Sequence, residues 1–235
     1  MRTFGYWTTI AFAVVAFLVG QFAALAVVAV WLRPGSLNAL LAAPFDGEVV
    51  TLFILVSNPV TAGFLWLAAK QISVPADYLA LTRPRPRDLK IGVALLIGLI
   101  AVSDLLLYAS GHALVTSFQL ESYRTAAAEG WLAAMLAAAI LVAPAGEEVL
   151  FRGFLFRGFV HSDRSAWIGI IVISIMWAAL HVQYDWTGIV QIFFAGLLLG
   201  FIRWRSGSTV LTFILHALFN LEGTLETVLQ IKLFS

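Results

Sequence analysis

Residues 3–32 read TFGYWTTIAFAVVAFLVGQFAALAVVAVWL, an apolar run without a charged side chain. A helix needs about 20 apolar residues to cross the roughly 30 Å of hydrocarbon in a bilayer, and this run exceeds that length. The rest of the chain is similar, since 61% of its 235 residues are hydrophobic and only 11% are charged. Soluble domains carry about 25% charged residues. The composition therefore excludes a soluble globular or disordered protein and predicts a membrane protein.

Further apolar runs of similar length follow along the chain. We expect about seven transmembrane helices, with eight as the upper count. The predicted spans are 3–32, 49–69, 91–109, 130–159, 165–184, 186–202 and 206–221. The stretch 36–45 is too short to cross and is expected to be interfacial or re-entrant, and 112–130 is expected to form a surface helix. These features predict an all-α, polytopic bundle in which residues 1–235 form one membrane-embedded domain.

The positive charges indicate how the bundle is oriented. With the N-terminus on the cytoplasmic side, ten of the 14 lysines and arginines fall in cytoplasmic loops or ends. Cytoplasmic loops of membrane proteins carry an excess of these residues. We therefore expect a cytoplasmic N-terminus and an external C-terminus. The ten residues are Arg2, Lys70, Arg83, Arg85, Arg87, Lys90, Arg157, Arg164, Arg203 and Arg205.

Residues 143–153, APAGEEVLFRG, place two carboxylates and an arginine inside an apolar run. An ionisable side chain within a span costs roughly 2.5–3.5 kcal/mol, so such residues are functional candidates. Glu148 and Arg152 are four residues apart, share one helix face and are expected to pair. Glu147 lies about 100° further round the helix and is left over. It must face a polar cavity or another partner.

Three more polar residues interrupt the later spans. His216 and Asn220 are four residues apart, and they therefore point the same way from an otherwise apolar helix. His181 ends the stretch Trp177-Ala178-Ala179-Leu180-His181. Earlier in the chain, Asp104 stands alone in its span and could pair with a cationic group elsewhere, which the sequence does not identify. The chemistry is therefore expected in the catalytic core 140–222.

A glutamate, two histidines and an asparagine around one cavity suit the addition of water to a carbonyl. Glutamate can take a proton from water, and histidine or asparagine N–H groups can hold the developing oxyanion. A divalent metal such as zinc is an alternative, with Glu147, His181 and His216 as its ligands. The sequence does not choose between these mechanisms. The absence of cysteine excludes disulfides, thiolate metal sites and a cysteine nucleophile.

Taken together, these motifs resemble a known family. Glu147-Glu148-x-x-x-Arg152, an aromatic-x-x-x-His ending at His181, and His216-x-x-x-Asn220 are similar to the three motifs of the CPBP family. That family comprises the CAAX-type prenyl endoproteases and the bacteriocin-processing or immunity proteins often called Abi. The resemblance covers residues 140–222, and it departs from the usual pattern at Trp177, where phenylalanine is common.

The resemblance implies an intramembrane, metalloendopeptidase-like enzyme in a bacterial or archaeal cell membrane. Glu147, His181, His216 and Asn220 would be catalytic, Glu148 and Arg152 would support them, and a membrane-associated peptide or protein would be the substrate. The lipid bilayer is the other expected partner, and no nucleic acid is expected. Two alternatives stay open: a catalytically inactive immunity or binding protein of the same fold, and a proton-coupled transporter that uses Glu147 as a relay.

Overall fold

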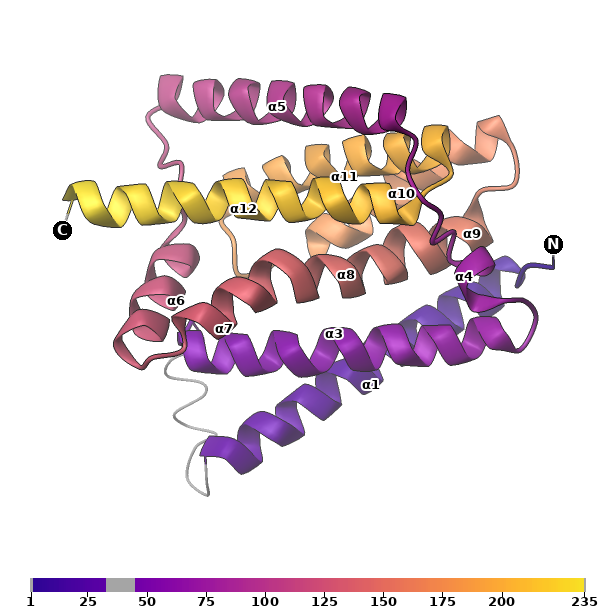
Figure 1. The fold of residues 1–235 in the computed structure, drawn as a ribbon, viewed down its shortest axis with the longest axis horizontal. Helices are drawn as coiled ribbons and strands as arrows, with labels where there is room; N and C mark the ends of the chain where they lie inside the picture. Colours follow the sequence, from indigo (N-terminus) through magenta and orange to yellow (C-terminus); the bar gives the residue numbers. More distant parts are fainter. Residues whose placement is uncertain (1, 33–44, 235) are drawn as a thin grey trace.

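The computed structural model describes residues 2–32 and 45–234, and every regular element among them is helical, as predicted. The long helices share one general direction (Figure 1). The predicted interfacial stretch lies, apart from Phe45, outside the described residues. The helices are α1 (Tyr6–Leu32), α3 (Gly47–Lys70), α4 (Pro75–Tyr78), α5 (Pro86–Ala109), α6 (Ser117–Ala128), α7 (Leu132–Ala137), η1 (Ala138–Val142), α8 (Ala143–Glu148), η2 (Val149–Leu155), α9 (Phe156–Phe159), α10 (Asp163–Ala179), α11 (Trp186–Ser206) and α12 (Thr209–Phe234).

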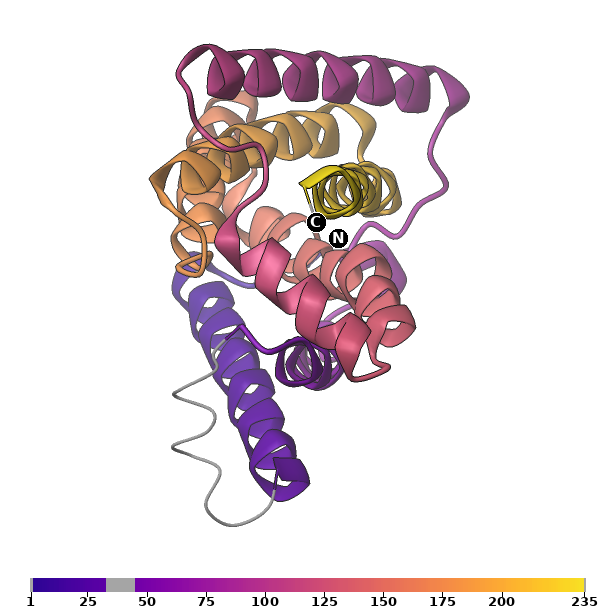
Figure 2. The same ribbon diagram turned by 90° about the vertical axis from the view of Figure 1, so that its left-hand side faces the viewer.

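The seven predicted spans each correspond to a long helix or to an unbroken series of short ones. Five of these segments are long and apolar enough to cross a membrane: α1, α3, α5, the series Leu132–Phe159, and α11. The remaining two are α10, which has 17 residues, and α12, whose apolar sequence is interrupted by polar side chains. The predicted surface helix is α6, which lies across one end of the bundle (Figure 2).

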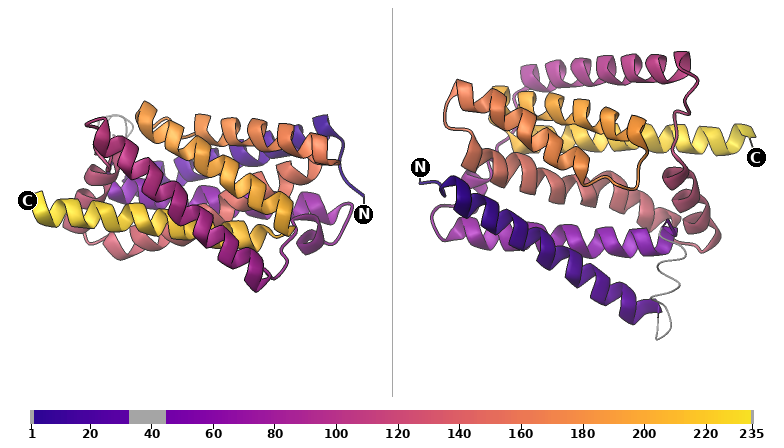
Figure 3. Two further views of the ribbon diagram at one scale, coloured as in Figure 1. Left: turned by 90° about the horizontal axis from the view of Figure 1, so that it is seen from above. Right: turned by 180° about the vertical axis from the view of Figure 1, so that it is seen from behind.

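The chain begins at one end of the bundle and finishes at the other (Figure 1). Helix α1 packs on α3 and leans away from the remaining helices (Figure 2). Helix α5 lies at the opposite edge, against α11 and α12. The series Leu132–Phe159 runs through the middle, and α10 lies obliquely on the face of the bundle that is turned away in Figure 1 and toward the viewer in the right-hand view of Figure 3. This central position brings residues 143–153 within reach of most other helices.

Local sequence signals fix where several helices begin and end. The side chain of Asp46 accepts the N–H of the third helical residue of α3, and Asp185 does the same for α11 through Gly188. The Gly188 N–H and then the Thr187 hydroxyl hold the pKa of Asp185 below its ordinary value. Helix α11 ends at Gly207, whose φ of 69° favours glycine. These signals set the lengths of the helices that carry the site.

The central segment is not a regular α-helix. The π-helical stretches η1 and η2 lie on either side of α8, the short helix that carries Glu147 and Glu148. Pro144, which has no backbone N–H to donate, follows directly after η1, where the regular α-helical pattern of hydrogen bonds is already interrupted. Wide turns of this kind are rare and occur often at functional sites.

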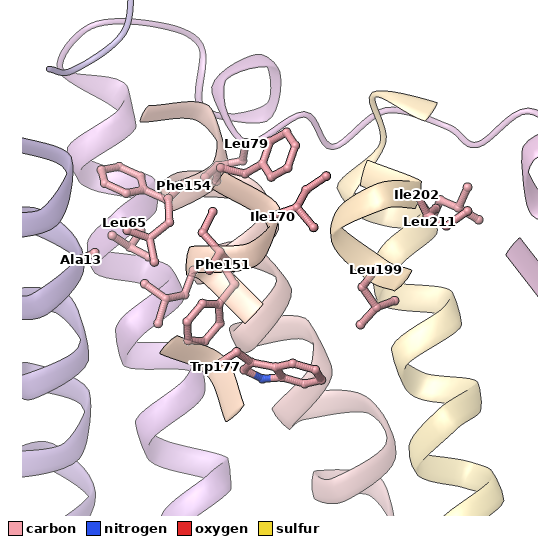
Figure 4. Packing of buried hydrophobic residues seen from close by; sticks show 14 of the residues in the cluster. Ala13, Leu65, Leu79, Phe151, Phe154, Ile170, Trp177, Leu199, Ile202 and Leu211 are labelled. Atoms are coloured by element: carbon pink, nitrogen blue, oxygen red, sulfur yellow. The ribbon is translucent and has the colours of Figure 1, made fainter. Parts of the chain in front are cut away.

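A single hydrophobic core surrounds this segment. Phe151 and Phe154 of η2 pack with Leu65 of α3 and Ile170 of α10 (Figure 4). Close helix contacts depend on small residues, as is common in membrane bundles. A Cβ atom added at Gly146 would lie 2.5 Å from the side chain of Asn58. Glycine at this position therefore lets α3 approach α8 directly beside the two glutamates.

Candidate functional site

Glu148 and Arg152 form the predicted ion pair. The Nη1 atom of Arg152 donates to Oε1 of Glu148 at 2.8 Å, and the side chain of each residue is only 1% exposed. Arg152 also donates to the carbonyl of Gly196 at 3.3 Å and lies 4.5 Å from the centre of the Trp177 ring. The pair therefore joins the central segment to α10 and α11.

The same carboxylate also holds His216. The Nδ1 atom of His216 lies 3.0 Å from Oε1 of Glu148, and the imidazole is almost fully buried. An ionised carboxylate only accepts hydrogen bonds, so Nδ1 carries the proton and Nε2 is the remaining polar atom of the ring. The sequence did not predict this contact, because nothing in the spacing relates residue 148 to residue 216.

Glu147 points away from the ion pair, as the helical geometry predicts. Its side chain lines a cavity, and its Oε2 atom accepts the indole N–H of Trp177 at 2.6 Å. One residue step along the helix, about 100°, is enough to separate the two adjacent glutamates. Glu148 is therefore buried within an ion pair, whereas Glu147 is available to the cavity.

His181 and Asn220 are both anchored to backbone carbonyls. His181 lies in the turn after α10, where its Nδ1 atom is 2.8 Å from the carbonyl oxygen of Trp177. A carbonyl only accepts, so Nδ1 is the donor in this bond. Asn220 of α12 donates one amide hydrogen to the carbonyl of Ala139 in η1 at 2.8 Å. The π-helical stretch thus supplies the acceptor that holds the asparagine.

The four predicted catalytic residues line one cavity of about 660 Å³. The prediction that they meet around a single pocket is confirmed, while Glu148 and Arg152 lie behind its wall. The cavity extends well beyond these four residues, toward α1, α3 and α6. Sequence reasoning missed Asn58 and Tyr184, which also line it, and it marked Trp177, a further lining residue, only as the aromatic residue of a motif. Asn58 carried a signal, since it is a polar residue within an apolar run.

The ligand atoms of the three predicted zinc ligands do not all lie within 4.8 Å of one another. Zinc bound to nitrogen and carboxylate ligands lies about 2.0–2.2 Å from each of them, so ligand atoms must come close together. Among the described residues, two groups have candidate ligand atoms within 4.8 Å of one another, and neither contains Glu147, His181 or His216. As they are placed, these three side chains do not fit a bound metal.

One of those two groups shows what lies beside Asp104. Asp104 of α5 lies with Glu222 and Glu226 of α12, so carboxylates gather at the residue for which the sequence left a cationic partner open. Glu222 and Glu226 also line the cavity that holds Glu147. The other group, Asp46, Glu48 and Glu129, lies apart from the candidate site.

The ion pair gives a stability prediction. Glu148→Ala leaves the buried Arg152 guanidinium without its counter-charge, and breaking a buried pair in this way costs about 3–5 kcal/mol. We expect a clear fall in the thermal unfolding midpoint of the detergent-purified protein. The matched control is Glu121→Ala, which removes an exposed carboxylate from α6. Equal midpoints for the two variants would contradict the structural role of Glu148.

Comparisons with known proteins match the part of the chain that carries the candidate site. Residues 129–221 match the family model described as type II CAAX prenyl endopeptidase Rce1-like. An uncharacterized 24.3 kDa protein of Escherichia coli is 33% identical over 78 residues, which cover 32% of this chain and 36% of that protein. The chain thus spans about a third of the curated relative that it matches. No solved structure matches.

The matched region contains the whole set of motif residues. It begins just before the central segment and ends after Asn220, so it includes the ion pair, both histidines and the asparagine. The motifs had indicated the same family. Residues 129–221 are therefore similar to the Rce1-like family of type II CAAX prenyl endopeptidases, which is the CPBP or Abi family.

Proposed function

We propose that this protein is an intramembrane endopeptidase in which Glu147 activates water to hydrolyse a peptide bond of a membrane-associated substrate. One observation carries the proposal: Glu147, His181, His216 and Asn220 line one cavity within a bundle of membrane-type helices. The family of residues 129–221 supports the same reaction class. The α1 and α3 walls of the cavity lie outside the matched region, so the substrate is proposed only by its class.

Glu147 is suited to act as the general base. Its Oε2 atom accepts the Trp177 indole N–H, and the hydrogen bonds of the described residues include no donor to its Oε1 atom. A water molecule at Oε1 can give one proton to Glu147 while its oxygen attacks the scissile carbonyl. When the tetrahedral intermediate collapses and the C–N bond breaks, Glu147 returns that proton to the leaving amine.

The anchored side chains supply orientation and charge stabilisation. With Nδ1 donating to the Trp177 carbonyl, a neutral His181 presents Nε2 as an acceptor for the second hydrogen of the water. Asn220 uses one amide hydrogen on Ala139 and retains the other for the oxyanion. Such a donor contributes about 2.7–4 kcal/mol to the transition state. His216 is held by Glu148 beside them.

Replacing the base tests the proposal directly. Glu147→Gln keeps the size of the side chain and its contact with the indole, but the amide cannot take a proton. We expect kcat to fall by at least about 10²-fold, the usual contribution of a general base. Cleavage of membrane-anchored peptides by the protein in liposomes, followed by mass spectrometry, measures this loss.

Glu222→Gln is the matched control, because Glu222 is a carboxylate on the α12 wall of the same cavity. It should retain cleavage. Unchanged kcat in Glu147→Gln would overturn the assignment of the base. A wild-type protein that binds peptides without cutting them would favour the inactive binding protein, and proton uptake without cleavage would favour the transporter.

We further propose that the reaction uses protein side chains alone, since the candidate ligand atoms of Glu147, His181 and His216 do not gather as zinc requires. We expect cleavage to stay within about twofold of its untreated rate in a strong zinc chelator, as metal-independent general-base chemistry predicts. Peptide cleavage before and after dialysis against the chelator is the measurement. Loss of activity that added zinc restores would show instead that these side chains rearrange to bind a metal.

We also propose a cytoplasmic N-terminus and an external C-terminus, on the basis of the lysine and arginine distribution. The two ends of the chain lie at opposite ends of the bundle, which suits an odd number of crossings (Figure 1). Fusion of alkaline phosphatase, which folds only outside the cytoplasm, should give activity at the C-terminus and none at the N-terminus. The reverse pattern would invert the orientation.

A further inference from the structure

Trp177 makes more polar contacts than a buried aromatic residue needs for packing. Its side chain is 1% exposed, yet its indole N–H donates to Oε2 of Glu147 at 2.6 Å. Its own carbonyl accepts from Nδ1 of His181 at 2.8 Å. The ring also meets the His181 and His216 rings edge-on, with centroids 5.3 and 5.0 Å away. One residue therefore contacts three of the four predicted catalytic side chains.

The indole hydrogen bond is specific in its direction. Tryptophan donates through one N–H and accepts nothing there, so the Glu147 oxygen that it holds must be the acceptor. Because Oε2 is held in this way, rotation of the Glu147 carboxylate is restricted and Oε1 is the oxygen left for water. Phenylalanine fills much of the same space and lacks the donor.

The supports of Trp177 fix its position. The Arg152 guanidinium lies 4.5 Å from the ring centre, and Arg152 is itself held by Glu148. Figure 4 shows Trp177 at one end of the hydrophobic core, beyond Phe151. The buried ion pair therefore reaches Glu147 through the indole.

We propose that Trp177 is a positioning residue of the peptidase site: its indole N–H orients the Glu147 carboxylate, and its carbonyl orients the His181 ring. This inference rests on the proposed function. In the proposed reaction Trp177 does not contact the substrate. It acts through Glu147, which it holds in the orientation that the base requires.

Two replacements separate positioning from packing. Trp177→Phe removes the donor and keeps an aromatic ring against Arg152. Site-specific incorporation of the benzothiophene analogue of tryptophan keeps the size of the whole ring system and removes only the N–H. For both, we expect kcat to fall by about 10- to 100-fold, the value of one hydrogen bond to a charged group, with KM within about twofold. The thermal midpoint of the analogue protein should match that of the wild type.

Trp31→Phe is the matched control. Trp31 also donates its indole N–H to a carboxylate, Oε1 of Glu48 at 2.7 Å, but this pair is exposed and does not line the cavity. Its loss should leave kcat unchanged. A spectroscopic readout that needs no activity is the indole N–H resonance of Trp177 in ¹⁵N-tryptophan-labelled protein. Glu147→Gln should shift this resonance and leave that of Trp31 in place.

The outcomes distinguish the two proposals. Wild-type cleavage with unchanged kcat in the analogue protein overturns the positioning role and leaves the peptidase assignment intact. A rise in KM without a fall in kcat also overturns the positioning role. A fall in kcat that Trp31→Phe matches overturns it too. An unshifted Trp177 resonance in Glu147→Gln refutes the contact itself. A wild-type protein without cleavage overturns both proposals together.

Discussion

The neutralisation of Glu148 inside the apolar bundle is the constraint on which the site depends. Moving a carboxylate or guanidinium out of water costs several kcal/mol for each ion, and close pairing with additional hydrogen bonds is needed to offset that cost. Glu148 meets this requirement through Arg152 and His216, and Arg152 is further bound to the Gly196 carbonyl. These contacts connect α8, η2, α11 and α12, because the charges of Glu148 and Arg152 cannot be left unpaired in an apolar interior.

The adjacent glutamates have different roles because of helical geometry alone. Glu148 faces the packed interior, where its charge is matched, and Glu147 faces the cavity, where a described donor occupies only one of its oxygens. Neutralising both residues would leave no base for the proposed reaction, and exposing both would remove the anchor of His216. The pair of identical residues thus combines a structural contact with a reactive group.

The sequence was informative where a single helix decides the outcome. Run lengths predicted the helical segments, and the four-residue spacing predicted the Glu148–Arg152 pair and the common face of His216 and Asn220. Contacts between helices could not be predicted, because they depend on the rotation and tilt of each helix. The Trp177–Glu147 bond and the carboxylate neighbours of Asp104 are of this kind. The zinc alternative used residue types alone, because the sequence does not give the spacing of the three side chains in three dimensions.

The π-helical stretch η1 contains no ionisable residue, yet it anchors the site, because its Ala139 carbonyl accepts the Asn220 amide. A π-helical turn holds one residue more than an α-helical turn, so the loss of one residue here can restore α-helical winding and leave the following segment facing almost the same way. The loss of one residue from a regular α-helix would instead rotate everything after it by about 100°. A one-residue difference in length between homologues is therefore tolerated best between positions 138 and 142, where Glu147 keeps its direction.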